Sequence, residues 1–195
     1  MPAALSDLHR IGIKIPCTDA AFPVRELVPV FHRWIQTAAI PGHLLVDVAD
    51  YEHVPEGPGI LLVAHEGNLG IDLIGGQLGL VYYRKQPLAG ALAARLRACT
   101  GIALHACRLL EHEAALGGRL HFNASQLEIF ANDRLHAPNA PATYDAFQPP
   151  LDGLLRALYG DAKCTVTRPT DARSRFGVTV TGPAATVDQL LTRLG

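Results

Sequence analysis

The sequence predicts an α+β fold made of two similar halves, each with the element order β-α-β-β(-β)-α, with mainly antiparallel sheets and helices on one face. Apolar and polar residues alternate at residues 9–16, with the period of a half-buried strand, and further strand segments are predicted in both halves. Helices that open at Pro29 and Pro150 each carry one apolar stripe that suits packing on a sheet. Gly59 and Gly177 lie in corresponding places at nearly the same separation, so the order and spacing of the elements predict an internal duplication.

The first half opens with a strand at residues 9–16, in which three isoleucines alternate with glycine and lysine. A helix follows from Pro29, because proline suits a first helical turn, where its missing N–H costs nothing. Pro41-Gly42 ends this helix. The rest of this half is predicted to hold strands at residues 44–49, 60–65 and 77–84, a turn at residues 55–59, a glycine-rich connection before the last of these strands, and a helix at residues 89–116 that breaks at Thr100-Gly101.

The second half repeats this plan from a strand at residues 120–131. A loop rich in proline and alanine is expected next, and a helix then opens at Pro149-Pro150 and ends at Gly160. The loop covers residues 133–148, two further strands cover residues 164–167 and 176–181, and the closing helix covers residues 187–194. We therefore expect half-domains at residues 1–117 and 118–195 that form one compact unit.

The closing segment FGVTVTGPAATVDQLLTRL and this element order resemble a ferredoxin-like half-domain. The resemblance implies a pseudo-dimer with helices on one face of antiparallel sheets. The extra strand at residues 77–84 also makes the first half similar to the β-α-β-β-β module of the glyoxalase-like (vicinal-oxygen-chelate) class. That class implies metal ligands on strands, where His9 is well placed, but the second half has no acidic residue or histidine at a matching position. The segments FHRWIQ, DVADYEHV and GPGILLVAHE resemble an uncharacterised group of bacterial proteins, from which no activity follows.

Composition and charge argue against several classes of partner. The chain has 195 residues, of which 49% are hydrophobic and 18% charged, so a sizeable core is available. Its 17 basic and 18 acidic residues are spread along the chain and aromatic residues are only 6%, whereas nucleic-acid surfaces need clustered basic residues and aromatic platforms. The first residues do not form a secretory signal, no apolar run is long enough to span a bilayer, and the four cysteines form no CxxC pair. We expect a cytoplasmic protein that binds neither nucleic acid nor a membrane.

The segment ILLVAHEGNLGID carries the main candidates for catalysis. An apolar strand ends there in His65-Glu66 and runs into glycines and Asp72. Adjacent strand residues point to opposite faces, so His65 and Glu66 converge only if Gly67 breaks the strand. In that case His65 can act as a general base, with Glu66 or Asp72 orienting its ring. The alternative is a strand-end histidine bonded to a backbone carbonyl beside a solvated glutamate.

A second group of residues is a candidate for ligand binding. His53 follows one strand, while Tyr82, Arg84 and Lys85 end another. If these strands are neighbours, Arg84 and Lys85 can hold a carboxylate or phosphate at the edge of the sheet, with Arg84 in a bidentate manner. The alternative is a set of exposed charges that contributes little to stability or binding.

Known cofactor motifs are missing from the chain. On a helix, His105 and His112 stand about 10 Å apart along the axis, too far for one zinc ion, and the chain has no HExxH motif. The GGQLG segment lacks the GxGxxG spacing and precedes a strand, where a dinucleotide-binding loop precedes a helix. We therefore predict no metal ligands and assign no cofactor.

Three kinds of function are compatible with these features. The first is a small-molecule-binding protein or enzyme with a pocket between the two halves. The second is a self-assembling or regulatory module, such as a homodimer. The third is a metal-dependent glyoxalase-like enzyme that uses His9, His65 and Glu66. We rank them in this order, and no residue pattern identifies a substrate.

Overall fold

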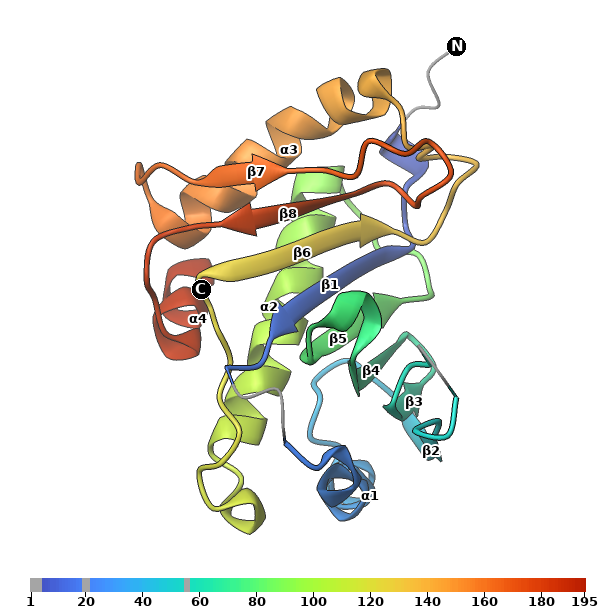
Figure 1. Ribbon diagram of the computed structural model, residues 1–195, viewed down its shortest axis with the longest axis vertical. Coiled ribbons are helices and arrows are strands. Elements are labelled where there is room, and N and C mark those ends of the chain that lie inside the picture. The colour runs from blue at the N-terminus through green and yellow to red at the C-terminus, as the bar shows by residue number, and fades with distance from the viewer. Residues whose placement is uncertain (1–4, 19–21, 55–56) are drawn as a thin grey trace.

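The structure is a computed structural model that describes residues 5–18, 22–54 and 57–195. Within these residues the chain forms one open sheet of eight antiparallel strands in the order β2-β3-β4-β5-β1-β6-β8-β7 (Figure 1). The predicted α+β class and the antiparallel pairing are confirmed. The strands are β1 (Ile11–Pro16), β2 (Leu45–Asp50), β3 (Ile60–Ala64), β4 (Gly67–Asp72), β5 (Gly79–Arg84), β6 (Gln126–Ala131), β7 (Thr165–Thr167) and β8 (Gly177–Thr181).

Four helices in the described residues pack against this sheet and against one another. The central helix α2 contacts β1 and β5 and also packs on α3 and α4, while α1 covers β2 and β3. In Figure 1, α2, α3 and α4 lie behind the sheet. The helices are α1 (Leu27–Thr37), α2 (Leu92–Glu111), α3 (Pro141–Tyr159) and α4 (Val187–Leu194).

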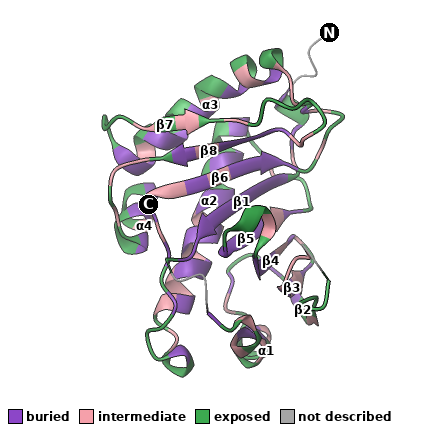
Figure 2. Cartoon of the chain, viewed as in Figure 1, coloured by how far each residue is buried: buried purple, intermediate pink, exposed green. Residues whose placement is uncertain are grey.

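The two faces of the central strands differ because side chains alternate along a strand. Ile11, Ile13 and Ile15 of β1 are all buried and face the helices. On the neighbouring strands, Tyr82 and Ile129 lie opposite Ile13 in the register and share this inner face. We call the other side the outer face, and β1 is buried there as well, as Figure 2 shows.

The first strands of the two halves, β1 and β6, pair with each other at the middle of the sheet. Beside them lie β5 on one side and β8 on the other. The sheet therefore continues from residues of the first half to residues of the second without a gap between them.

One strand was missed by the sequence analysis. Residues between the strands expected at 60–65 and 77–84 form β4, which pairs with both β3 and β5. Its inner-face residues Leu69 and Ile71 are buried, but on the outer face Gly70 contributes no side chain to the alternation. The glycines that suggested a loop are in fact strand residues. Of the turn expected at residues 55–59, residues 55–56 lie outside the described part of the chain.

Both long helices differ from the expected ones. The predicted break at Thr100-Gly101 is wrong, because α2 runs unbroken through both residues. Thr100 and its neighbour Cys99 are fully buried, and this packing outweighs the roughly 1 kcal/mol that glycine costs inside a helix. Helix α3 begins at Pro141, not Pro149, so most of the predicted loop at residues 133–148 is helical.

The early start of α3 follows from its buried face. Thr143 and Phe147 are buried on the same stripe as Leu151 and Leu154, with the spacing of a helix. Pro141 occupies the first turn, where proline is favoured. Strand β6 is also shorter than predicted, since it begins at Gln126 and only Phe122 makes an isolated bridge before it.

Candidate functional site

A buried ion pair lies on the outer face of the sheet. The Lys14 ammonium on β1 donates to Asp72 Oδ1 at the end of β4 and to the carbonyl oxygen of Ile74, both at 2.7 Å. The side chains of Lys14 and Asp72 are only 5% and 1% exposed. The lysine stem crosses the intervening strand β5 above Gly79, where an added Cβ would stand 3.0 Å from Lys14 Cε. A glycine at this position therefore lets the lysine reach its partner.

Asp72 accepts further hydrogen bonds that complete this arrangement. The hydroxyl of Tyr83 donates to its Oδ2 at 3.1 Å, and the backbone N–H of Ile74 donates to its Oδ1 at 3.2 Å. Burial and the adjacent Asp72 charge raise the pKa of Tyr83. Asp72 and Lys14 thus hold Ile74 on the outer face, and Asp72 has a positioning role.

A small hollow with a cavity volume of about 50 Å³ lies beside this ion pair, and a second one of about 60 Å³ adjoins it. They share Glu128 and Thr179 in their linings, and we call these two adjoining hollows over β1, β6 and β8 the outer groove. It takes residues from both halves of the chain. Its polar lining consists of Lys14, Gln77, Gln126, Glu128, Arg175 and Thr179.

Glu128 occupies the middle of the outer groove. It lies directly opposite Lys14 in the β1–β6 register, on the same face of the sheet. Its side chain is half-buried, and within the described residues no hydrogen bond or ion pair engages its carboxylate. Lys14 also has three N–H donors, of which Asp72 and the Ile74 carbonyl take two. Both residues can therefore offer polar atoms to a ligand.

The far end of the outer groove is built around Phe130. Its ring lies on Gly12, where an added Cβ would stand 2.0 Å from a ring carbon. The guanidinium carbon of Arg175 lies 3.5 Å from the ring centroid, and Tyr83 meets the ring edge-to-face at 5.5 Å. The aromatic ring therefore supports Arg175 at this end of the groove.

Comparisons with known proteins find no match. No family model, no curated protein and no solved structure matches the chain significantly. The site therefore has to be interpreted from its own geometry.

The structure does not bring the predicted catalytic residues together. His65 and Glu66 form the turn between β3 and β4, whereas Asp72 ends β4. The five residue steps of β4 span about 17 Å at the usual rise of a strand. His65 is exposed, and Glu66 Oε2 accepts the backbone N–H of Leu44 at 2.7 Å, a bond that lowers the pKa of Glu66. His65 and Glu66 therefore lie out of reach of Asp72.

Tyr82 and Arg84 belong to a closed network on the inner face. His43 Nδ1 faces the carbonyl oxygen of Pro41 at 3.1 Å, so this nitrogen carries the proton, and Tyr82 donates its hydroxyl to His43 Nε2 at 2.9 Å. Burial raises the pKa of Tyr82 to about 12 and lowers the pKa of His43. Arg84 donates to the Tyr82 hydroxyl and to the carbonyls of Gln86 and Pro87. These groups satisfy one another.

The expected meeting of His53 with Arg84 and Lys85 does not occur. Strands β3 and β4 separate β2 from β5. The registers also place His53, which follows β2, at the opposite end of the strands from Lys85, which follows β5. Both His53 and Lys85 are exposed. The hypothesis rested on these strands being neighbours, and that assumption is wrong.

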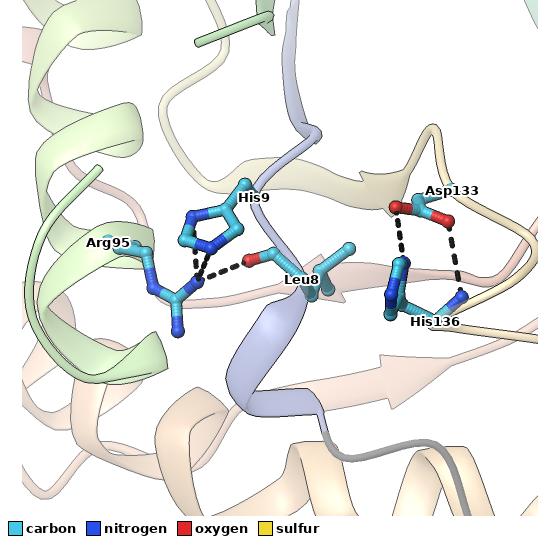
Figure 3. Close-up of polar contacts among 5 residues, drawn as sticks. All are labelled: Leu8, His9, Arg95, Asp133 and His136. Carbon is cyan, nitrogen blue, oxygen red and sulfur yellow. Dashed lines mark hydrogen bonds and ion pairs between the residues drawn. The ribbon is translucent and has the colours of Figure 1, made fainter. Parts of the chain in front are cut away.

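His9 and Arg95 meet just before β1, near a second pair formed by Asp133 and His136 (Figure 3). Arg95 donates to the carbonyl of Leu8 at 2.9 Å and contacts His9 Nδ1 at 3.0 Å. Asp133 accepts the backbone N–H of His136 at 3.1 Å, and its Oδ2 lies 2.9 Å from His136 Nδ1. Partial burial raises the pKa of Asp133, but the bonds from His136 outweigh it and lower that pKa.

These contacts bear on the metal hypothesis. A guanidinium beside His9 repels a cation, so His9 is poorly placed as a metal ligand. Among the described residues, no group of three or more His, Cys, Asp or Glu side chains could hold a metal ion. None of the helices formed by residues 5–18, 22–54 and 57–195 has the length and hydropathy to cross a membrane.

A larger hollow near β2 is less suited to polar recognition. It is lined mainly by apolar side chains such as Phe22, Tyr51 and Leu73. Its acidic residue Glu52 already accepts from Arg25 at 2.5 Å. The outer groove therefore has the stronger claim to be the functional site.

The sequence analysis did not select Lys14 or Glu128. Both carry a weak signal, because each is a charged residue between two buried apolar neighbours of a strand and so must point to the outer face. The pairing of β1 with β6 brings Lys14 and Glu128 side by side, and this pairing cannot be inferred from the residues around either position.

Proposed function

We propose that the protein binds a small molecule rich in hydroxyl or amino groups in the outer groove. The observation that carries this proposal is the carboxylate of Glu128, which lies in the groove and is engaged by no other described residue. The carboxylate oxygens are not among the buried atoms without a partner, so they remain open to hydrogen-bond donors of a ligand that enters the groove. Hydroxyl and amino groups are the donors that a carboxylate accepts best in a small molecule.

The rest of the lining fits the same kind of ligand. The third N–H of Lys14 and the carboxamides of Gln77 and Gln126 offer donors and acceptors on one side of Glu128. Gln77 donates to Gln126 Oε1 at 3.2 Å, which orients both amides. Polar groups held in this way fix the orientation of a ligand with several hydroxyl groups.

The proposal retains the expected pocket between two repeats. The strand orders β4-β5-β1 and β6-β8-β7 mirror each other about the β1–β6 pair, which supports a duplicated ferredoxin-like plan. In that arrangement the groove lies where the two halves join. That the protein forms a homodimer stays a prediction. A functional role for His65 and Glu66 also stays a prediction.

Thermal unfolding with and without candidate ligands tests the proposal. The probes are myo-inositol, glucosamine and putrescine, which differ in hydroxyl and amino content. A ligand present at about ten times its Kd stabilises the folded state by about 1.4 kcal/mol, which raises the Tm of a chain of this size by about 3–6 °C. We expect at least one probe to do so, and Glu128→Gln to remove at least half of the shift.

Two comparisons make the result decisive. Asp145→Asn, an exposed carboxylate on α3 outside the groove, should leave the shift unchanged. His65→Ala and Glu66→Ala test the original catalytic candidates in the same assay. The proposal fails if no probe shifts the Tm, or if Glu128→Gln and Asp145→Asn behave alike.

A further inference from the structure

We propose that the far end of the outer groove binds an anionic group, a phosphate or a carboxylate, of the same ligand. The proposal rests on the function proposed above and adds a charged group to that ligand. It is carried by four arginines on two loops, residues 132–140 and 168–175, that meet at the end of β6 and β8. We call these four residues the arginine cluster: Arg134, Arg168, Arg173 and Arg175.

Hydrogen bonds hold the two loops together. The Asn139 amide donates to the carbonyls of Pro169 and Asp171 at 3.1 and 2.8 Å. Arg134 donates to the carbonyl of Arg173 at 2.6 Å. The loops therefore form one surface, and the positions of their arginines are linked.

No member of the arginine cluster forms an ion pair with a carboxylate of the described residues. Three other arginines, Arg25, Arg33 and Arg119, each form an ion pair with a carboxylate, but no member of the cluster does. Of the two acidic residues of these loops, Asp133 binds His136, and Asp171 accepts the backbone N–H of Arg173 and keeps its negative charge.

Aromatic rings position two of these guanidinium groups. Arg175 lies 3.5 Å above Phe130, and Arg168 lies 5.2 Å from the ring centroid of Tyr144. Such stacking holds a guanidinium in place, and although Arg175 also interacts with the Tyr83 hydroxyl, the remaining N–H edge of each guanidinium can donate hydrogen bonds. That edge matches the two oxygens of a carboxylate or phosphate.

Arg175 connects this surface to the outer groove. It lines the same hollow as Glu128, and Pro169 of the second loop also lines it. A ligand whose hydroxyl or amino group reaches Glu128 would therefore present its other end to Arg175. Glu128 in the middle of the groove and Arg175 at its far end then select a molecule that carries hydrogen-bond donors at one end and a negative charge at the other.

The test measures the Tm of the full chain in sodium phosphate, sodium succinate and sodium chloride at equal ionic strength. We expect phosphate or succinate to raise the Tm above its value in chloride, because an anion that binds the folded state stabilises it. The ionic strength is equal in the three salts, so a general screening effect is the same in each. A larger shift in phosphate assigns a phosphate group, and a larger shift in succinate assigns a carboxylate.

Variants then locate the effect. Arg175→Gln and Arg173→Gln should each remove at least half of the anion-specific Tm shift. Arg175→Lys should show a smaller shift than the wild type, because lysine lacks the planar guanidinium that binds two oxygens at once. Arg173 is exposed, so its replacement tests the surface even if Arg175→Gln disturbs Phe130. The control is Arg156→Gln, an exposed arginine on α3 outside both loops, which should leave the shift unchanged.

The outcomes separate this proposal from the one on which it rests. Glu128→Gln should keep the anion-specific shift while it loses the response to the neutral and amino probes. Equal Tm values in all three salts would overturn the anion site, as would an equal loss in Arg156→Gln and Arg175→Gln. The binding function itself would be overturned by the probe assay, whatever the salts show.

Discussion

At the scale of single residues, the pairing of Lys14 with Asp72 shapes the outer face. The two residues are 58 positions apart in the chain and come from strands that are separated by β5. Burying two charges is costly, and here a short ion pair and further hydrogen bonds from Ile74 and Tyr83 offset that cost. The pair anchors the loop that forms one wall of the outer groove.

Breaking this pair should destabilise the protein strongly. In Lys14→Met, Asp72 is left buried without its cation, and we expect the free energy of unfolding to fall by about 3–5 kcal/mol. Urea denaturation measures the loss. Adding Asp72→Asn to Lys14→Met should restore part of the stability, because no charge is then left unpaired.

The matched control for that prediction is an exposed ion pair. Arg25→Met removes the partner of Glu52 at a site where the arginine side chain is 74% exposed, and its effect should be small because solvent screens the interaction. Equal urea midpoints for Lys14→Met and Arg25→Met would show that the buried pair contributes little.

At the scale of elements, the helices show how tertiary packing overrides local propensity. Residues Cys99 and Thr100 are fully buried where α2 crosses the sheet, so α2 continues through a glycine. Helix α3 likewise continues through Pro149 and Pro150, because Phe147 and Leu151 on either side are buried. Glycine or proline inside a helix costs about 1–3 kcal/mol, and the free energy gained by burying the neighbouring side chains is larger.

Gly101 in α2 is a position where this conflict can be removed. An added Cβ there meets no atom within 4 Å, and alanine is the better helix former. We expect Gly101→Ala to raise the free energy of unfolding by about 0.5–1 kcal/mol in chemical denaturation.

Gly12 in β1 is the contrasting position in the same experiment. A Cβ there would overlap the ring of Phe130, which must then leave its place beneath Arg175. Gly12→Ala should lower stability. A loss of stability in Gly101→Ala would mean that α2 needs its glycine for a reason other than space.

At the scale of the whole molecule, the two halves depend on each other. Strand β1 of the first half pairs with β6 of the second, and α2 of the first half packs on α3 and α4 of the second. The outer groove also takes Lys14 from one half and Glu128 from the other. Neither half has a complete sheet surface without its partner.

Separate chains covering residues 1–117 and 118–195 test this dependence. We expect each to lack cooperative thermal unfolding by circular dichroism, because each exposes the apolar surface that the other buries. An equimolar mixture should regain the cooperative transition and elute as one complex in size-exclusion chromatography. If residues 118–195 unfold cooperatively alone, the half-domains are independent units.

Local patterns predicted much of the fold. The alternation in β1 identified it as a strand, and the spacing of apolar residues identified α1, because these signals arise within a few neighbouring residues. Strand β4 was not predicted, because its glycines carry no side chain and so interrupt the alternation of apolar and polar residues. The candidate site was predicted less well, since only Asp72 of the seven chosen residues lies beside the outer groove, where it anchors the loop that lines one side.

The sequence by itself determined the α+β class, the order of most elements and the outward direction of Lys14 and Glu128 on their strands. Only the tertiary structure decided which strands are neighbours, and therefore that Lys14 meets Asp72, that Glu128 stands without a partner, and that His65 is far from Asp72. The physical reason is that strand pairing joins residues that are distant in the chain. Each pairing depends on how the apolar faces of all elements are buried together, which no local window of sequence contains.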